Sequence, residues 1–319
     1  MGPSESRPAS SRLTVRVSRI APIGLDTRLF ELSALGAEPL PAVAPGAHID
    51  VHLAEGVVRQ YSVLTPLSAP TSYVIAVQRE SAGRGGSRRL HDECRVGSTI
   101  QIGGPRNNFA LNEAAPDTLL LAGGIGITPI LGMLERLREL DRKVHLHYFS
   151  RSPERALFRD RLEQRADCTI HYPAAERPTL RSVVQGADAE CELYCCGPAS
   201  MLQEFAAATK SRPPHRLHLE RFSLLPIEEP SGEFTVVLVK SRTEVRVRDG
   251  ETILGVLRAA CIDVAYSCEE GVCGACEVRY LAGVPLHRDA VRTAAEHERL
   301  STVMICCARS RSKRLTLDL

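Results

Sequence analysis

Tryptophan is absent from this sequence of 319 residues, and aromatic residues make up only 4% of it. Proteins that hold nucleic acids by stacking need aromatic platforms, so this scarcity argues against such a platform. Lys and Arg outnumber Asp and Glu by only two, which gives a formal net charge of +2 at pH 7. A nearly balanced charge is not typical of a chain whose main task is to bind a polyanion. The composition therefore predicts no nucleic-acid partner.

Long apolar runs are missing as well. No segment approaches the ~18 consecutive apolar residues that a membrane-spanning helix needs. The first eleven residues, MGPSESRPASS, lack the apolar centre of a secretory signal. Eleven cysteines without such a signal are typical of a reducing compartment rather than of a disulfide scaffold. We therefore expect a cytoplasmic protein that has no membrane partner.

Four cysteines near the C-terminus form the most specific pattern in the sequence. Cys268, Cys273 and Cys276 lie in the stretch SCEEGVCGAC, and 29 residues separate Cys276 from Cys306. This spacing is that of the plant-type [2Fe–2S] site. The two glycines of the stretch relieve crowding between ligands and permit the positive φ angles that aim N–H groups at sulfur. The alternatives are a zinc site, which usually combines two C-x2-C or C-x2-H pairs, or ordinary buried cysteines.

A possible flavin site lies in the first third of the chain. Residues from about Leu13 to Gly104 form a pattern of short strands separated by Gly and Pro, as in an antiparallel barrel. One strand contains Arg59, Tyr61 and Ser62 in the motif R-x-Y-S. Side chains alternate along a strand, so Arg59 and Tyr61 share a face, where they suit a flavin phosphate and ring. The alternative is a coincidence on a solvated strand.

A glycine-rich turn follows in the stretch GRGGSRRL. It places Gly85, Gly86 and Ser87 just before the helical pattern RRLHDE. Free N–H groups at the start of a helix form an anion site, so this turn predicts a phosphate-binding position. The alternative is a flexible glycine turn with solvated arginines.

From about Ala115 to Glu220 strands alternate with helices, which predicts a parallel sheet with helical crossovers. The strand TLLLAGG runs into a turn that contains Gly124, Gly126 and Thr128, and a helix is predicted over 129–140. Glycines in such a turn let the backbone approach a pyrophosphate. The turn is not the G-x-G-x-x-G fingerprint with its acidic ribose ligand, so a Rossmann site is not predicted.

A second motif of this region follows the strand CELYCC. The strand ends at Cys196, Gly197 and Pro198. Ligands of open α/β sheets bind at the carboxyl ends of strands, which makes these residues candidates to face a nucleotide. The alternative for the cysteine is a small buried residue. Phe222, in the closing segment ERFS, is predicted either to lie near a flavin or to cap the nucleotide core.

Together, these motifs resemble those of the phthalate dioxygenase reductase and vanillate O-demethylase reductase family, over nearly the full length after residue 12. The resemblance implies FMN, held by the R-x-Y-S and glycine-rich segments. It implies NADH as the electron donor, with Cys196 near the nicotinamide and Thr128 near the flavin, although Arg151 leaves NADPH open. It also implies Cys306 rather than Cys307 as the fourth cluster ligand, and a Rieske-type oxygenase as the partner.

The predicted fold is therefore multidomain. An antiparallel β-barrel flavin domain spans 12–112, and an α/β parallel-sheet nucleotide domain spans 113–223. A linker at 224–232 leads to an α+β plant-type ferredoxin domain at 233–319. In that last domain, FTVVLVK and TEVRVRD are predicted to form a hairpin, residues 252–260 a helix, and Cys261 part of the core.

The function that the resemblance implies is electron transfer, and no catalytic side chain is assigned. A hydride brings two electrons from NADH, FMN divides them, and the [2Fe–2S] centre carries single electrons to the partner. Two alternatives stay open from the sequence. One is a reductase that supplies a cytochrome P450, and the other is a flavin and iron–sulfur redox sensor without turnover.

Overall fold

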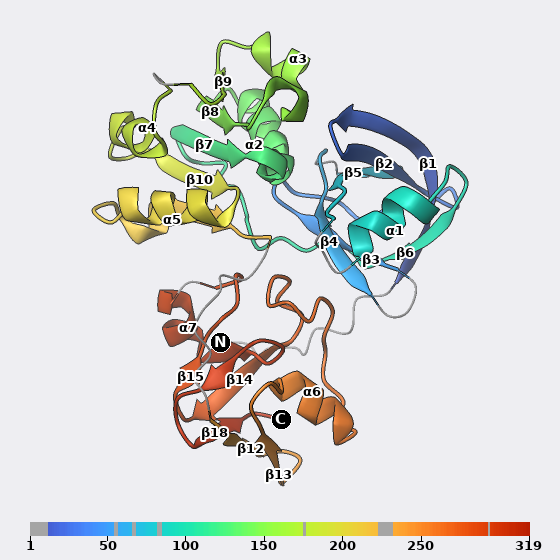
Figure 1. Cartoon of the computed structure of the whole chain (residues 1–319), viewed down its shortest axis with the longest axis vertical. Helices are drawn as coiled ribbons and strands as arrows, with labels where there is room; N and C mark the ends of the chain where they lie inside the picture. The colour runs from blue at the N-terminus through green and yellow to red at the C-terminus, as the bar shows by residue number, and fades with distance from the viewer. Residues whose placement is uncertain are drawn as a thin grey trace. The chain divides into compact units, whose positions relative to one another are not determined.

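The computed structural model describes residues 12–53, 57–65, 68–81, 85–174, 177–222, 232–292 and 294–319. The chain forms two compact units, Met1–Glu220 and Arg221–Leu319 (Figure 1). The predicted barrel and nearly all of the predicted nucleotide domain belong to the first unit, and the predicted ferredoxin domain belongs to the second. The boundary between barrel and nucleotide domain stays a prediction. The predicted linker lies, apart from Gly232, outside the described residues.

The first unit begins with a six-stranded antiparallel sheet in the order β4-β3-β6-β1-β2-β5. Its strands are β1 (Leu13–Gly24), β2 (Thr27–Ala34), β3 (His48–His52), β4 (Val58–Ser62), β5 (Ser72–Gln78) and β6 (Thr99–Ile102). A bridge between Val63 and Ile75 joins the two edges, so the sheet closes into the predicted barrel. Alternate residues such as Val15 and Val17 fill its core, against which Leu90 of helix α1 (Gly86–Glu93) packs.

The second part of this unit is a five-stranded parallel sheet in the order β11-β10-β7-β8-β9. Its strands are β7 (Asp117–Gly123), β8 (Lys143–Phe149), β9 (Cys168–His171), β10 (Glu192–Cys196) and β11 (Leu217–Glu220). Helices α2 (Ile127–Glu139) and α3 (Arg159–Glu163) pack on one face, and α4 (Leu180–Gly186) and α5 (Ala199–Ala208) on the other. The order of strands changes direction between β7 and β10. Ligands of such sheets bind at this switch point.

The second unit contains a five-stranded mixed sheet in the order β13-β12-β18-β14-β16. Its strands are β12 (Phe234–Leu238), β13 (Thr243–Val247), β14 (Glu277–Ala282), β16 (Thr302–Met304) and β18 (Arg314–Leu317). A second ladder joins β15 (Pro285–Leu286) to β17 (Arg309–Ser310). Helix α6 (Ile253–Ala259) begins at a Thr252 cap whose hydroxyl accepts from the Gly255 N–H, and α7 is Ala294–Leu300. Strands β12 and β13 form the predicted hairpin.

The helix predicted over 129–140 begins two residues earlier than expected. A 3-10 turn over Gly124–Gly126 leads directly into α2 at Ile127. Pro129 therefore stands third in the helix, still within the first turn, where no backbone N–H has an intrahelical partner. In the parts of the chain that the structure describes, no helix has both the length and the apolar character needed to cross a membrane.

Candidate functional site

The four predicted cluster ligands converge in the second unit. The Cys268 thiol is in hydrogen-bonding contact with the thiols of Cys273 and Cys306, and the Cys306 thiol also contacts Cys276. All four side chains are buried. Hydrogen bonds from Cys273 and Cys306 lower the pKa of the Cys268 thiol. The contact with Cys268 raises the pKa of the Cys273 and Cys306 thiols, so the group favours one thiolate, at Cys268, and thiolate is the form that binds metal. Four buried thiols at one place fit the donor set of a [2Fe–2S] cluster.

The backbone of the cluster loop has the predicted geometry. Gly271 and Gly274 have φ angles of +65° and +75°. The N–H of Glu270 donates to the Cys268 sulfur at 3.2 Å, and the N–H of Ala275 donates to the Cys273 sulfur at 3.5 Å. N–H groups aimed at sulfur stabilise thiolate charge. The loop is thus shaped by the backbone as well as by the cysteines.

The adjacent cysteines 306 and 307 have different surroundings. Cys306 contacts both Cys268 and Cys276, which lie at the two ends of the loop motif. Cys307 also touches Cys306, but its sulfur donates to the carbonyl oxygen of Met304 at 3.7 Å. This geometry supports Cys306 as the fourth ligand, and the assignment stays a proposal.

In the first unit, the two predicted flavin segments lie against each other. A Cβ atom added at Gly86 would be only 2.7 Å from Arg59 Cγ, so glycine is needed for the arginine to cross the start of α1. Gly85 has φ +87° and stands at the N-cap of α1. Ser87 Oγ accepts a hydrogen bond from the Glu80 N–H at 3.0 Å. The guanidinium and the open end of a helix together form a cationic site that suits a phosphate.

A depression of about 360 Å³ lies along α1, from Gly85 at its start to Glu93 at its end, and Arg59 is not among its lining residues. Its lining residues are Val57, Arg79, Gly85, Gly86, Arg88, Arg89, Asp92 and Glu93. On the neighbouring strand β4, Ser62 is buried and Tyr61 packs against the barrel core. Burial raises the pKa of the Tyr61 phenol, which keeps the hydroxyl protonated as a donor. The residues present therefore fit a flavin phosphate, with polar groups for the rest of the molecule on β4.

The glycine turn after β7 meets the end of β10. A Cβ atom at Gly126 would lie 2.3 Å from the carbonyl oxygen of Cys196, and Gly123 and Gly197 also approach closely. Gly124 has φ +54°, and a Cβ there would meet nothing within 4 Å. Gly126 is thus required by the neighbouring strand, whereas Gly124 leaves open space at the switch point. The backbone of this turn therefore has room for the predicted pyrophosphate on the Gly124 side, and not on the side of Gly126, which faces Cys196.

The close approach of Gly126 to β10 supports a first prediction. We expect Gly126→Ala to lower the free energy of unfolding by about 1–3 kcal/mol, because a methyl group cannot fit against a backbone carbonyl without a shift of the chain. The control is Gly36→Ala, since nothing lies within 4 Å of a Cβ at Gly36. That change should stay within about 0.5 kcal/mol. Chemical denaturation of both variants measures the difference, and equal stabilities would contradict the prediction.

Comparisons with known proteins agree with this geometry. Residues 237–311 match the family described as "2Fe-2S iron-sulfur cluster binding domain". The chain is 41% identical to phenoxybenzoate dioxygenase subunit beta of Ectopseudomonas oleovorans over 311 residues, which cover 96% of this chain and 97% of that protein. This chain belongs to the phthalate dioxygenase reductase family. The solved phthalate dioxygenase reductase, described as a modular structure for electron transfer from pyridine nucleotides to [2Fe–2S], has a TM-score of 0.72 at 34% identity and covers 97% of this chain and 98% of that one.

An intact type IV self-sufficient cytochrome P450 monooxygenase shares the fold too. Its TM-score is 0.87 at 37% identity, and the match covers 97% of this chain but 41% of that chain. As a member of the phthalate dioxygenase reductase family, this chain is an oxidoreductase that transfers electrons. The predicted succession of barrel, parallel-sheet region and ferredoxin domain is confirmed.

Sequence reasoning for this family member gave no role to Glu220. The residue ends β11 beside Cys196 at the end of β10, and the Cys196 sulfur lies 4.0 Å from Glu220 Oε2. Glu220 keeps part of its surface exposed, but surrounding protein atoms raise the pKa of its carboxyl to about 8. Burial also raises the pKa of the Cys196 thiol. The signal was available, because an acidic residue at the carboxyl end of a parallel strand stands where ligands bind.

The remaining predicted residues of this reductase differ in their surroundings. Thr128 is buried, and its hydroxyl donates to the Ile125 carbonyl at 2.9 Å, which leaves its lone pairs free to accept. Pro198 forms the N-cap of α5. Phe222 is 44% exposed and lies outside both hydrophobic clusters of the nucleotide region. Phe222 belongs to the second unit, so its two predicted places, near the flavin or over the nucleotide core, both stay predictions.

Proposed function

We propose that this chain passes electrons from NADH through FMN to a [2Fe–2S] cluster and on to a separate Rieske-type oxygenase. The convergence of four buried thiols, from Cys268, Cys273, Cys276 and Cys306, carries the proposal. Two further features support it. Arg59 and the start of α1 form a cationic site for a flavin phosphate, called the phosphate cradle below, and the parallel sheet has the topology of a nucleotide-binding domain. When bound, FMN supplies the change from two-electron to one-electron transfer, and the cluster supplies a one-electron centre.

In this proposal the barrel binds FMN. Arg59 and the N–H groups at the start of α1 hold the phosphate, and Gly85, Gly86 and Ser87 give it room and partners. Tyr61 and Ser62 of β4 hold the remainder of the flavin. FMN rather than FAD rests on the resemblance to the family, in which the ferredoxin domain stands at the C-terminal end of the chain.

The parallel-sheet region binds NADH at the switch point between β7 and β10. Gly124 gives the dinucleotide access to the start of α2, and Gly197 and Pro198 border the site from β10. Thr128 accepts hydrogen bonds where flavin and nicotinamide meet. Cys196 stays a neutral thiol at this place, because burial and the neighbouring Glu220 both disfavour the thiolate. Its role is to fill space and exclude water, and not to act as a nucleophile.

The partner is the part of the proposal that the family leaves open. The relative from Ectopseudomonas carries a dioxygenase name, which supports an oxygenase of aromatic compounds. The likeness to the self-sufficient P450, at a TM-score of 0.87, favours a cytochrome P450 as the second candidate. Reduction of a purified Rieske oxygenase and of a purified P450 under identical conditions tests the choice. An assay of NADH oxidation with cytochrome c as acceptor tests the redox-sensor alternative, which rapid turnover would exclude. We propose the cytoplasm as the location, because free thiolates need a reducing compartment.

A second prediction concerns the cofactor content. We expect the purified protein to contain one FMN and two iron atoms per chain, because one phosphate cradle and one set of four thiols are described. Chromatography of the flavin released by heat, together with iron and zinc analysis, measures this. A flavin that elutes as FAD would contradict the FMN assignment, and zinc in place of iron would contradict the cluster.

A further inference from the structure

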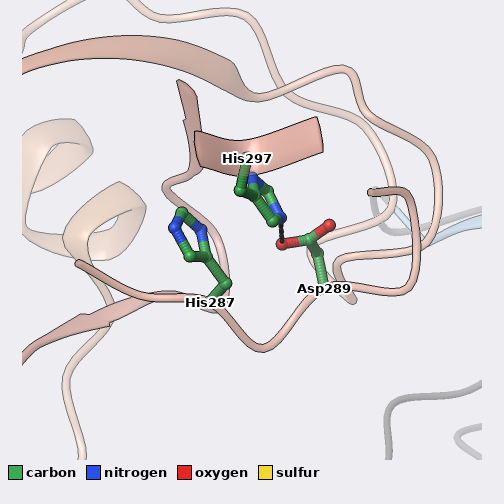
Figure 2. A group of neighbouring side chains, drawn as sticks. All are labelled: His287, Asp289 and His297. Carbon is green, nitrogen blue, oxygen red and sulfur yellow. Dashed lines mark hydrogen bonds and ion pairs between the residues drawn. The ribbon is translucent and has the colours of Figure 1, made fainter. Parts of the chain in front are cut away.

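A buried pair of charged side chains lies in the second unit, outside the residues that the proposed function uses. His297 of α7 and Asp289 have side chains that are 2% and 0% exposed, and His297 Nε2 is 2.8 Å from Asp289 Oδ1. Figure 2 shows this contact and the ring of His287 beside it. The two imidazole rings stack with their centroids 3.6 Å apart and an angle of 13° between their planes.

A metal ion is the first candidate for this group, because one ligand atom from each of the three residues lies within 4.8 Å of the other two. The geometry of the rings opposes it. The lone pair of an imidazole nitrogen lies in the plane of its ring, so two stacked and nearly parallel rings cannot direct their lone pairs at one ion. The distance of 2.8 Å between His297 and Asp289 is that of a hydrogen bond. The group therefore holds a proton and not a metal ion.

The hydrogen bonds of His297 define its protonation. Its Nδ1 is 3.2 Å from the Thr302 carbonyl oxygen, and its Nε2 faces Asp289, so both ring nitrogens face acceptors. A neutral imidazole has only one N–H, so only the imidazolium can donate to both acceptors at once. The other oxygen of Asp289 accepts from the N–H groups of Val291 and Arg292 at 3.2 and 3.0 Å. The hydrogen bonds on both sides of the pair fit an imidazolium beside a carboxylate.

His287 completes the group as a neutral ring. Burial lowers the pKa of His287 to about 4, and the charge of His297 acts in the same direction. Its Nδ1 is buried and has no hydrogen-bond partner among the described residues. A neutral aromatic ring stacked on an imidazolium is favourable, which fits a cation–π contact.

The pair is joined to the segments that carry the cluster thiols. Next to Asp289, the Ala290 N–H donates to the carbonyl oxygen of Gly271, in the loop between Cys268 and Cys273, at 2.8 Å. Thr302, whose carbonyl oxygen faces His297 Nδ1, begins strand β16, and β16 ends two residues before Cys306. Strand β16 pairs with β14, which follows Cys276. The pair is therefore linked to the cluster loop through the neighbouring residue Ala290, and to the strand that precedes Cys306 through Thr302.

We propose that His297 is a positioning residue for electron transfer: its charge neutralises Asp289 and so keeps an uncompensated buried carboxylate from lowering the reduction potential of the cluster. The inference rests on the proposed function, because it needs the cluster to be bound. Reduction adds one electron, and hence one negative charge, at the four thiols. A balanced pair acts only as a dipole there, but a lone buried carboxylate would oppose the added charge strongly in a low-dielectric interior.

The direction of the effect follows from the charge that a variant leaves behind. His297→Gln keeps a hydrogen-bond donor for Asp289 but leaves the carboxylate without its counter-charge. We expect the ratio of reduced to oxidised cluster at a fixed potential to fall about tenfold, which is a shift of ~59 mV for one electron. The double variant Asp289→Asn with His297→Gln has neither charge, and its potential should return to that of the unchanged protein. His287→Phe retains a stacked ring and should leave the potential unaltered.

The experiment is a spectroelectrochemical titration of the cluster in the full-length protein and these three variants, with iron and zinc analysis of each. A lower potential in His297→Gln that the double variant restores supports the inference. An unchanged potential in His297→Gln contradicts the inference, and so does an equal shift in the single and the double variant. One zinc ion per chain that is lost in His297→Gln would also contradict it, because the three side chains would then form a metal site. His297→Gln could also fail to keep its iron. In that case, iron retained by the double variant supports the inference, and an equal loss of iron from both variants contradicts it. Absence of any cluster from the unchanged protein would instead contradict the proposed function.

Discussion

Replacing Cys306 by serine is expected to abolish the iron–sulfur absorption and nearly all transfer of electrons to cytochrome c, whereas Cys307→Ser keeps both. A plant-type cluster needs four thiolates, and a serine hydroxyl does not ionise at neutral pH to replace one. The Cys306 thiol contacts those of Cys268 and Cys276. The Cys307 sulfur donates to the Met304 carbonyl, and a serine hydroxyl can make the same bond. We therefore expect Cys307→Ser to change the free energy of unfolding by no more than about 1 kcal/mol.

The two variants are matched, because they make the same chemical change at adjacent buried positions. Visible absorption, iron per chain and the EPR signal after chemical reduction decide between them. A cluster retained by Cys306→Ser and lost by Cys307→Ser would move the fourth ligand to Cys307. Flavin reduction by NADH serves as the internal control and should be unaffected in both variants, since the residues proposed to bind FMN and NADH, apart from Phe222, lie in the first unit.

Ending the chain at residue 232 should leave reduction of the flavin by NADH nearly intact and remove almost all reduction of cytochrome c. The hydrophobic clusters of the barrel and of the parallel sheet consist of residues that precede Glu220, and the cluster of the second unit begins at Phe234. Each unit thus has its own core and can fold without the other. The four cluster thiols all belong to the part that is removed.

Stopped-flow absorbance at the flavin band measures the first half of this expectation, and steady-state assays with cytochrome c and with a quinone measure the second. The quinone should still be reduced, because it accepts electrons directly from the flavin. Loss of flavin reduction from a shortened chain that still binds FMN would show that the units depend on each other. Unchanged cytochrome c reduction would show that electrons leave the protein from the flavin and not from the cluster.

The cluster loop could be predicted from the sequence because its determinants are local. Cys268, Cys273 and Cys276 lie within one loop, and their spacing alone limits the geometry. Glycine at 271 and 274 marks positive φ angles, which the structure confirms. Glu269 also has a positive φ angle, +57°, and its residue type gave no indication of this conformation. The prediction that Cys261 belongs to the core was wrong, because it follows α6 with φ +57° and its side chain is exposed.

Contacts between distant segments could not be predicted in the same way. The pairing of Cys196 with Glu220 depends on the register of β10 against β11, and the contact of Arg59 with Gly86 depends on where α1 sits on the barrel. Strands β6 and β9 have only four residues each, too few for a clear alternating pattern. The pair of Asp289 and His297 was not predicted, because the contact depends on how the segment around Asp289 packs against α7, which no sequence pattern indicates.

The position of β18 in its sheet has a consequence for biosynthesis. This strand lies at the centre of the order β13-β12-β18-β14-β16, yet it is the last of the five to leave the ribosome. The first unit can fold while translation continues, since N-terminal domains generally fold first. The second cannot complete its sheet until β18 arrives between β12 and β14. All four predicted ligand cysteines are therefore synthesised before the sheet that buries them is complete, so a cluster inserted earlier would have to bind to a partly folded second unit.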